Sequence, residues 1–133
     1  MSSNDTATIK VLVVDDQKTF RDAARAVLER LNGFEVLAEA RSGEEAIEMT
    51  ALAQPDLVLM DINMGGIDGV ETTRQLTSTY PGLLVVLMST YELCDLPPGA
   101  RSSGASAYIN KDDLGGRWIR RIWEDRGDPL FGR

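Results

Sequence analysis

Short apolar runs recur along the chain, and polar or turn residues bound each of them. The three clearest are Ile9–Val14, Leu57–Met60 and Leu83–Met88. Leucine-rich and β-branched runs of this length are typical of strands buried on both faces of a parallel sheet. Phe34–Ala40 and Ala107–Ile109 are weaker candidates for two further strands. The pattern therefore predicts a sheet that is covered from both sides.

The stretches between these runs carry apolar side chains at three- and four-residue steps, the spacing of an amphipathic helix. The predicted helices run from Phe20 to Leu31, from the candidate N-cap Ser42 to Pro55, from Val70 to Tyr80, and from Leu114 through Trp118 to Ile122. Alternating strands and helices of this length indicate an α/β fold with a doubly wound, five-stranded parallel sheet.

The connection between the last two predicted strands departs from this pattern. Tyr91 to Gly104 contains Pro97-Pro98-Gly99, and proline lacks the backbone N–H that a helix interior uses. We therefore expect the fourth helix to be irregular, which means short, displaced or mobile.

The composition sets limits on the function. With 133 residues the chain suits one domain, which we assign to residues 9–124, between a disordered N-terminus (1–8) and a C-terminal tail (125–133). A formal net charge of −7 argues against direct binding of nucleic acid. No apolar run reaches the ~20 residues of a membrane span. Cys94 is the single cysteine and histidine is absent, which excludes disulfide and histidine chemistry and, with no export signal, predicts a cytoplasmic protein.

Polar residues gather where the predicted strands end. The sequence places Asp15 and Asp16 after the first run, Asp61 after the third, Ser89 and Thr90 after the fourth, and Lys111 after the fifth. In a doubly wound sheet these carboxyl ends face one crevice. Crowded carboxylates raise one another's pKa unless a cation joins them, and a group of oxygen ligands suits Mg²⁺. A carboxylate beside such an ion can attack phosphorus, and a lysine ammonium can pair with the phosphoryl oxygens.

Each of these residues has a simpler explanation when it is taken alone. Asp15 and Asp16 suit the cap of the following helix. Asp61 suits a turn, Ser89 a loop hydroxyl, and Lys111 a solvated surface charge. Their shared position at one edge of the predicted sheet is what favours a common site.

Four segments of the chain, VLVVDD, LVLMDINMGGIDG, VLMST and GASAYINKDD, resemble the motif series of receiver domains in two-component response regulators. The spacing and the aspartate after the lysine resemble the NarL/LuxR-like branch of this CheY-like family. The resemblance covers roughly Lys10 to Trp123. It implies a flavodoxin-like sheet with the strand order 2-1-3-4-5.

The resemblance also implies a phosphoacceptor with a magnesium ion beside it. Asp61 matches the phosphoacceptor. Asp16 matches the direct ligand of Mg²⁺, and Asp15 the second acid, which often acts through water. Asn63 would offer its backbone carbonyl to the same ion, which Asp61 also contacts.

A further group matches the family's switch residues. Ser89 matches the hydroxyl that hydrogen-bonds the phosphoryl group, with Thr90 as a one-residue alternative. Lys111 matches the lysine that pairs with that group. Tyr108 matches the aromatic that moves inward when the hydroxyl moves, although without the resemblance it suits a half-exposed position on an edge strand.

Two features depart from the family pattern. Gly65, followed by Gly66, stands where the family usually has proline, and this pair predicts a looser loop beside the acceptor. The Pro97-Pro98-Gly99 segment lies in the helix that most receivers use for output, so it predicts altered signalling.

The resemblance implies a histidine kinase or phosphotransfer protein as partner, and a phosphoacceptor rather than an enzyme with substrate turnover. Homodimer formation is a further expectation, and neither nucleic acid nor a membrane is expected to bind this chain. One alternative is a phosphorylation-independent binding module. Another is an aspartate-nucleophile phosphatase, which would need a second aspartate where Asn63 stands. Whether a DNA-binding output domain follows in a longer protein stays open.

Overall fold

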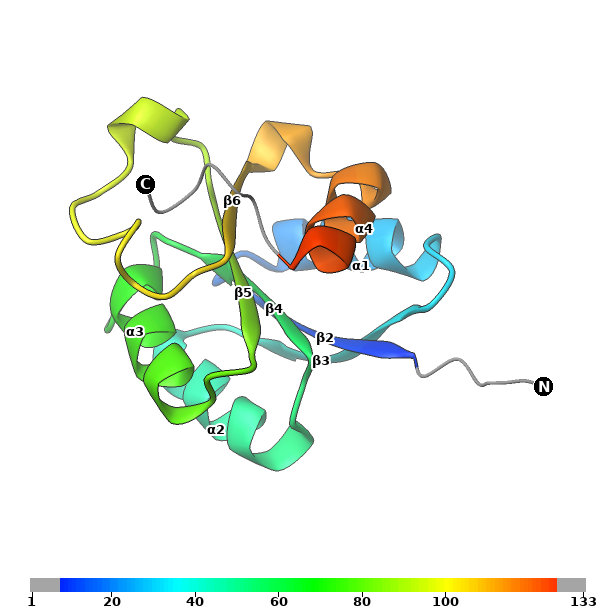
Figure 1. The fold of residues 1–133 in the computed structure, drawn as a ribbon, viewed down its shortest axis with the longest axis horizontal. Coiled ribbons are helices and arrows are strands. Elements are labelled where there is room, and N and C mark those ends of the chain that lie inside the picture. Colours follow the sequence, from blue (N-terminus) through cyan, green and yellow to red (C-terminus); the bar gives the residue numbers. More distant parts are fainter. Residues whose placement is uncertain (1–7, 127–133) are drawn as a thin grey trace.

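The computed structural model describes residues 8–126 of the chain. Within that range a parallel five-stranded sheet has the order β3-β2-β4-β5-β6 (Figure 1). The strands are β2 (Ile9–Val14), β3 (Phe34–Ala40), β4 (Leu57–Asp61), β5 (Leu84–Ser89) and β6 (Ala107–Asn110). Counted along the chain, this order is 2-1-3-4-5, which confirms the predicted fold class.

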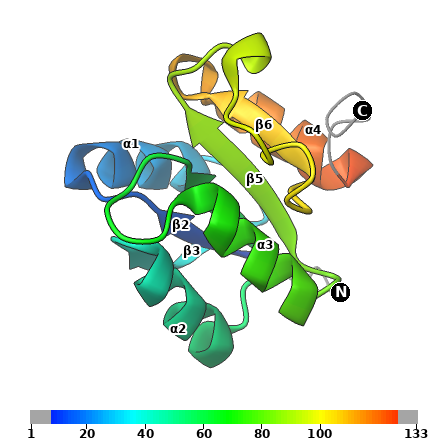
Figure 2. The same ribbon diagram turned by 90° about the vertical axis from the view of Figure 1, so that its left-hand side faces the viewer.

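Helices cover both faces of the sheet. They are α1 (Lys18–Glu29), α2 (Gly43–Ala53), α3 (Gly69–Thr79) and α4 (Gly116–Asp125), with short 3₁₀ helices η1 (Leu93–Asp95) and η2 (Lys111–Asp113). Helices α1 and α4 pack on one face, and α2 and α3 on the other (Figures 1 and 2). None of these helices is long and apolar enough to cross a bilayer.

The core consists of two apolar layers, one on each face of the sheet. Val11 and Val13 of β2 join the layer beneath α1 and α4, whereas Leu12 and Val14 join the layer above α2 and α3. Successive side chains of a strand point to opposite faces, and all four are at most 1% exposed. A strand that is buried on both faces has no polar alternation, which is why the apolar runs are continuous in the sequence.

Side chains cap two of the α-helices. The Ser42 hydroxyl accepts a hydrogen bond from the Glu45 backbone N–H at 3.0 Å, which confirms the predicted N-cap of α2. Asp68 caps α3 in the same way, through the backbone N–H of Glu71 at 2.8 Å. The apolar spacing predicted a start after Gly69, so Asp68 is a cap that the sequence pattern did not reveal.

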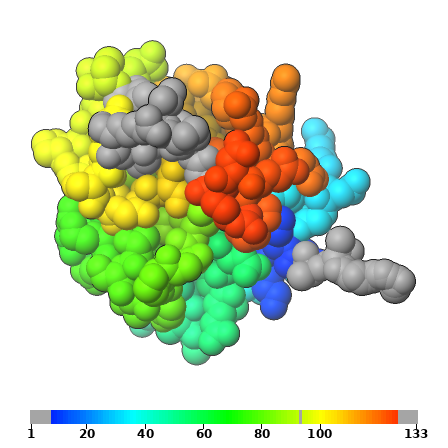
Figure 3. Space-filling model, viewed as in Figure 1, coloured from blue at the N-terminus to red at the C-terminus, as the bar shows by residue number. Residues whose placement is uncertain are grey.

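The connection from β5 to β6, where the sequence predicted an irregular helix, contains no α-helix and only the single 3₁₀ turn η1. That prediction is therefore confirmed. After η1 the segment forms further turns, which are closed by hydrogen bonds between residues three apart, such as the bond from the Ala100 N–H to the Pro97 carbonyl at 3.2 Å. The segment still packs closely: Ala100 is 1% exposed, and Thr77 of α3 donates to the Ser103 carbonyl at 2.9 Å. In Figure 3 the yellow atoms of this segment lie directly beside the green atoms of α3.

The last helix differs from its prediction. It begins at Gly116 rather than at Leu114, because Gly115 has an extended backbone and acts as the N-cap. Ile119 and Ile122 are buried as expected, but Trp118 is 49% exposed, with the Arg121 guanidinium 5.9 Å from its ring centroid. The assignment of Trp118 to the apolar face was therefore wrong. The predicted disordered N-terminus (1–8) and tail (125–133) fall almost entirely outside the described residues and stay predictions.

Candidate functional site

The register of the sheet brings the candidate residues to one edge. The pairing of β2 with β4 places Asp15, which follows β2, beside Asp61, the last residue of β4. Ser89 ends β5 and pairs with Asn110, and Lys111 follows directly. The carboxyl ends of all four strands therefore meet at the switch point between β2 and β4, where ligands bind in doubly wound folds.

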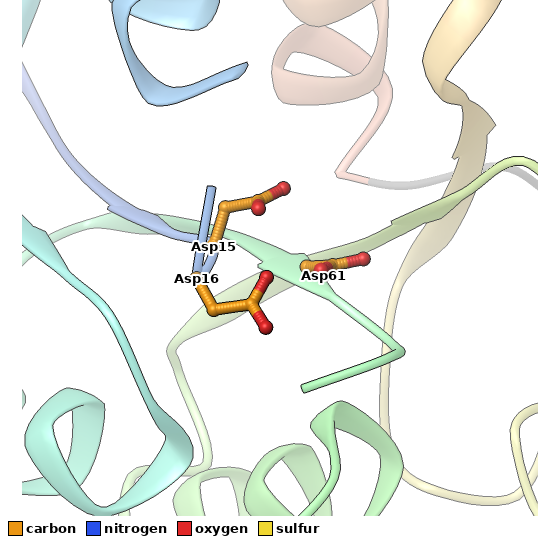
Figure 4. A group of neighbouring side chains, drawn as sticks. All are labelled: Asp15, Asp16 and Asp61. Carbon is orange, nitrogen blue, oxygen red and sulfur yellow. The ribbon is translucent and has the colours of Figure 1, made fainter. Parts of the chain in front are cut away.

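Three carboxylates form the centre of this edge. One oxygen from each of Asp15, Asp16 and Asp61 lies within 4.8 Å of the others, and the three side chains lie together where β2 and β4 end (Figure 4). Asp15 is fully buried and Asp61 is 3% exposed, whereas Asp16 is exposed. The cluster therefore consists of two buried acids and one acid that is exposed to solvent.

Lys111 supplies the positive charge that faces these acids. Its Nζ lies 2.6 Å from Asp15 Oδ2 and 3.4 Å from Asp61 Oδ1. The same ammonium lies 4.4 Å from the ring centroid of Phe20, which adds a cation–π contact. Burial opposes the charge, but the hydrogen bond to Asp15 and the negative charge of Asp61 outweigh it and raise the pKa of Lys111. The lysine is therefore a fixed cation at the edge of the cluster.

The environment of Asp61 disfavours its charged form. Burial and the neighbouring charge of Asp15 raise the pKa of Asp61 to about 6, against the opposing effects of Lys111 and the Asn63 backbone N–H. An acid with this pKa is mostly ionised at neutral pH and more basic than an ordinary aspartate. A cation placed beside it would relieve the repulsion between the two buried acids.

The donor set fits a hard divalent cation. Among residues 8–126, the three clustered carboxylates offer oxygen ligands only, the type that Mg²⁺ and Ca²⁺ prefer. Three carboxylates face the single ammonium of Lys111, so the cluster retains negative charge for a cation to neutralise. Asn63 follows at the surface, two residues beyond Asp61, and its carbonyl is a further oxygen of this type.

Ser89 and Tyr108 form a second polar group beside the acidic cluster. The Ser89 hydroxyl is 2.7 Å from the Tyr108 hydroxyl and accepts a hydrogen bond from the Tyr91 backbone N–H at 3.0 Å. Tyr108 also donates to the carbonyl of Tyr91, and burial raises its pKa. Thr90, the alternative to Ser89, is exposed. The structure thus links Ser89 to Tyr108 rather than to the carboxylates.

The loop between β4 and α3 contains the two glycines that depart from the family pattern. Gly65 has open space where a side chain would project. Gly66 has a positive φ of 74° and lies against the carboxylate of Glu44 on α2. Gly69 begins α3 so close to β4 that a β-carbon there would overlap the carbonyl oxygen of Asp61. The loop is therefore open at Gly65 and closely packed at Gly69.

Sequence reasoning missed one residue of this site. Arg21 on α1 is 7% exposed, and its Nη1 donates a hydrogen bond of 2.7 Å to the backbone carbonyl of Asp15. Arg21 stands three residues before Ala24 and seven before Leu28, both buried, so helical spacing placed it on the buried face. That signal was present in the sequence, but arginine is a residue type that is rarely buried, so the spacing alone did not single out Arg21.

The sequence is similar to a family of known proteins. A family model described as the response regulator receiver domain matches residues 11–116. The transcriptional regulatory protein DegU of Brevibacillus brevis is 36% identical over 104 residues, which cover 78% of this chain and 44% of DegU. The response regulator GacA of Pseudomonas syringae is 38% identical over 103 residues, which cover 77% of this chain and 48% of GacA. The matched region therefore spans less than half the length of these relatives.

Solved structures show the same fold. A two-component response regulator of the LuxR family from Aurantimonas superposes with a TM-score of 0.80 at 27% identity, over 90% of this chain and 85% of that one. The signal receiver domain of the putative response regulator NarL from Mycobacterium tuberculosis gives a TM-score of 0.79 at 25% identity, over 90% of this chain and 96% of that one.

Proposed function

This chain belongs to the response regulator receiver domain family, and from that membership we propose that it accepts a phosphoryl group on Asp61 and thereby switches its contacts with other proteins or with an output domain. One observation carries the proposal. Asp61 is 3% exposed at a strand end, within 4.8 Å of two further carboxylates and 3.4 Å from the ammonium of Lys111. A turn residue or a solvated acid would have no reason to be buried among like charges.

The proposed reaction is an in-line transfer from a phosphohistidine of a histidine kinase or phosphotransfer protein. A carboxylate oxygen of Asp61 forms the new O–P bond, and the P–N bond breaks with its electron pair going to the departing imidazole nitrogen. The pKa of about 6 leaves Asp61 mostly ionised at neutral pH, so a nucleophile is available. Lys111 pairs with the transferred oxygens, and the chain contributes mainly positioning and electrostatics.

Mg²⁺ is the proposed cofactor, and Asp15, Asp16, Asp61 and the carbonyl of Asn63 are the residues that would hold it. When bound, this ion supplies the positive charge that balances the acids and the phosphoryl oxygens. The protein's own part is to hold two carboxylates in a buried position and to orient them, which Lys111 supports through its contact with Asp15 at 2.6 Å.

The proposed switch runs through Ser89. A phosphoryl group carries a charge near −2 and several acceptor oxygens, so it would draw the Ser89 hydroxyl away from its present partners. Ser89 holds the Tyr108 hydroxyl at 2.7 Å and the Tyr91 backbone N–H at 3.0 Å. Its movement would therefore release or reorient Tyr108 and the start of the β5–β6 connection, which biases a two-state equilibrium.

The setting of this reaction is proposed from the family. We place the chain in the cytoplasm, where a kinase domain would supply the phosphoryl group. It would act as a phosphoacceptor that takes part in its own transfer and dephosphorylation, without substrate turnover. Homodimer formation and the lack of direct binding to nucleic acid or to a membrane stay predictions.

Labelling with acetyl phosphate tests the acceptor. With Mg²⁺ present, intact-mass spectrometry should show one added phosphoryl group on the native chain. Asp61→Asn should abolish the label, whereas Asp95→Asn, a change at an exposed acid in η1, should retain it. Undiminished labelling of Asp61→Asn would refute the assignment.

Beryllofluoride separates this function from a phosphorylation-independent binding module. A receiver should bind this phosphoryl analogue in the presence of Mg²⁺ and show shifted amide resonances around Ser89 and Tyr108. A binding module without phosphoacceptor chemistry should leave the spectrum unchanged.

A further inference from the structure

Arg21 is a buried cation for which the proposed reaction has no role. It is 7% exposed, and among the described residues it is the one lysine or arginine that is buried. A guanidinium is costly to bury unless charges and hydrogen bonds compensate it. Its partners therefore indicate what it does.

One partner is the backbone of the acidic cluster. Arg21 Nη1 donates to the carbonyl oxygen of Asp15 at 2.7 Å. That carbonyl belongs to the peptide group that joins Asp15 to Asp16, so the hydrogen bond fixes the plane from which the Asp16 side chain departs. The Asp15 backbone N–H is held on its other side by the Ala40 carbonyl at 3.0 Å.

The side chain of Asp15 is held as firmly as its backbone. Oδ1 accepts from the Gln17 N–H at 2.8 Å, and Oδ2 accepts from Lys111 at 2.6 Å. All four polar atoms of Asp15 therefore have partners. Asp16 lies between two restrained peptide groups, one fixed by Arg21 and one by the Asp15 carboxylate.

The other partner of Arg21 is Glu39 at the end of β3. Arg21 Nε donates to Glu39 Oε1 at 3.0 Å, and Arg25 of α1 donates to Oε2 of the same carboxylate at 2.8 Å. Burial opposes the charge of Glu39, but the hydrogen bonds from Arg25 and Arg21 outweigh it and lower the pKa of Glu39. Glu39 thus orients the guanidinium so that another of its nitrogens faces Asp15.

We propose that Arg21 is a positioning residue that holds the Asp15–Asp16 peptide group in the orientation required to bind a divalent cation. The inference rests on the proposed function, because it assigns Arg21 to the cation site of that reaction. Groups behind metal ligands typically change metal affinity about 10- to 100-fold when they are removed. Arg21 acts through hydrogen-bond geometry and touches neither the ion nor the phosphoryl group.

The sign of the effect separates positioning from simple electrostatics. Removing a cation near an acidic cluster should strengthen the binding of a divalent ion if charge alone mattered. Removing the hydrogen bond that orients the acids should weaken it. Arg21→Met therefore gives opposite results under the two explanations.

The chain offers a matched control in Arg25→Met. This substitution removes the same charge from the same helix and from the same partner, Glu39, but leaves the bond from Arg21 to Asp15 in place. Mn²⁺ serves as the probe, because the electron paramagnetic resonance signal of the free ion reports its concentration directly. Urea unfolding of each variant shows that the titrated protein is folded.

We expect Arg21→Met to raise the Mn²⁺ dissociation constant about tenfold, and Arg25→Met to leave it within about twofold of the native value. An unchanged or lower constant for folded Arg21→Met would overturn the inference, as would equal weakening by both substitutions. Should Arg21→Met fail to fold, Arg21→Gln replaces it. Glutamine places its amide nitrogen where Arg21 has Nε, so it can still donate to Glu39 but is two atoms too short to reach the Asp15 carbonyl. Native affinity in that variant also overturns the inference.

Failure of the proposed function would look different. In that case the native chain would take no label from acetyl phosphate, or Asp16→Asn would bind Mn²⁺ as the native chain does. A native chain that is labelled and binds Mn²⁺, together with a folded Arg21→Met of native affinity, refutes the role of Arg21 alone.

Discussion

The neighbouring strands β2 and β4 lead into acids of the same cluster, but the polypeptide around the two acids differs. At the end of β2, Asp15 has hydrogen-bond partners for its N–H, its carbonyl and both carboxylate oxygens. At the end of β4, Asp61 contacts Lys111 at the longer distance of 3.4 Å, and the chain continues into a loop with Gly65 and Gly66. Every polar atom of the acid on the β2 side is hydrogen-bonded, whereas the β4 side leads into a loop with open space at Gly65.

The difference fits the two tasks that the acids are proposed to perform. A cation site requires oxygens in a fixed arrangement, and ordering them in advance avoids an entropy cost on binding. An acceptor must admit a phosphoryl group and then carry it, so the chain beside Asp61 has to accommodate new bulk and charge. In the loop that follows Asp61, a β-carbon at Gly65 would meet no atom within 4 Å. Rigidity on the β2 side and space on the β4 side are therefore complementary.

The largest expected effect comes from the closely packed end of the acceptor side. A β-carbon at Gly69 would overlap the Asp61 carbonyl, so Gly69→Ala must push α3 away from β4. We expect a loss of about 3 kcal/mol in the free energy of unfolding, measured in urea. Gly82→Ala is the control, because a β-carbon at Gly82 would have no neighbouring atom within 4 Å. If Gly69→Ala were as stable as the native chain, the start of α3 would be able to move away from β4 at little cost, and the close packing at Gly69 would not contribute to stability.

The next effect tests the charge of Asp61. Burial and Asp15 raise its pKa from 3.8 to about 6 in the folded chain, so between these values the folded state binds more protons than the unfolded state. Stability therefore falls as pH rises through this window. In EDTA, Asp61→Asn should remove this fall and exceed the native stability at pH 7 by about 2 kcal/mol, after allowance for solvent screening.

The comparison with pH 3 completes that experiment. This pH lies below both pKa values, so Asp61 is mostly protonated in the folded and the unfolded state, and the native chain and Asp61→Asn should be nearly equally stable. A native stability that rises between pH 4 and pH 6 relative to Asp61→Asn would show that Asp61 is stabilised in its charged form by the metal-free fold.

Much of this contrast could be predicted from the sequence. The continuous apolar runs located the strands, and the acid, hydroxyl or lysine that follows each run placed the cluster at one edge. This worked because a parallel sheet brings carboxyl ends together whatever the details of packing. The predicted ends of β2 and β3 agree with the structure, whereas three predicted strands ended one residue early, since Asp61, Ser89 and Asn110 belong to β4, β5 and β6.

What could not be predicted depends on contacts between distant elements. The bond from Arg21 to Asp15 joins a helix to a strand end, and its pairing with Glu39 joins two strands through that helix. Arginine is usually found at the protein surface, so only the folded structure reveals that Arg21 is buried. Trp118 shows the opposite error, because an aromatic residue at helical spacing lies 49% exposed.

The smallest expected effect probes the glycine pair itself. Gly66 has a φ of 74° and a β-carbon added there would lie 2.8 Å from Glu44 Oε2, so Gly66→Ala should cost about 1 kcal/mol in the free energy of unfolding. Gly65 has neither constraint, and Gly65→Ala should be neutral or stabilise the chain by up to about 0.5 kcal/mol, because alanine restricts the unfolded state. Equal losses in urea from both substitutions would contradict the distinction. If Gly65→Ala also slows acetyl phosphate labelling while stability is kept, the open space at Gly65 serves phosphorylation rather than folding.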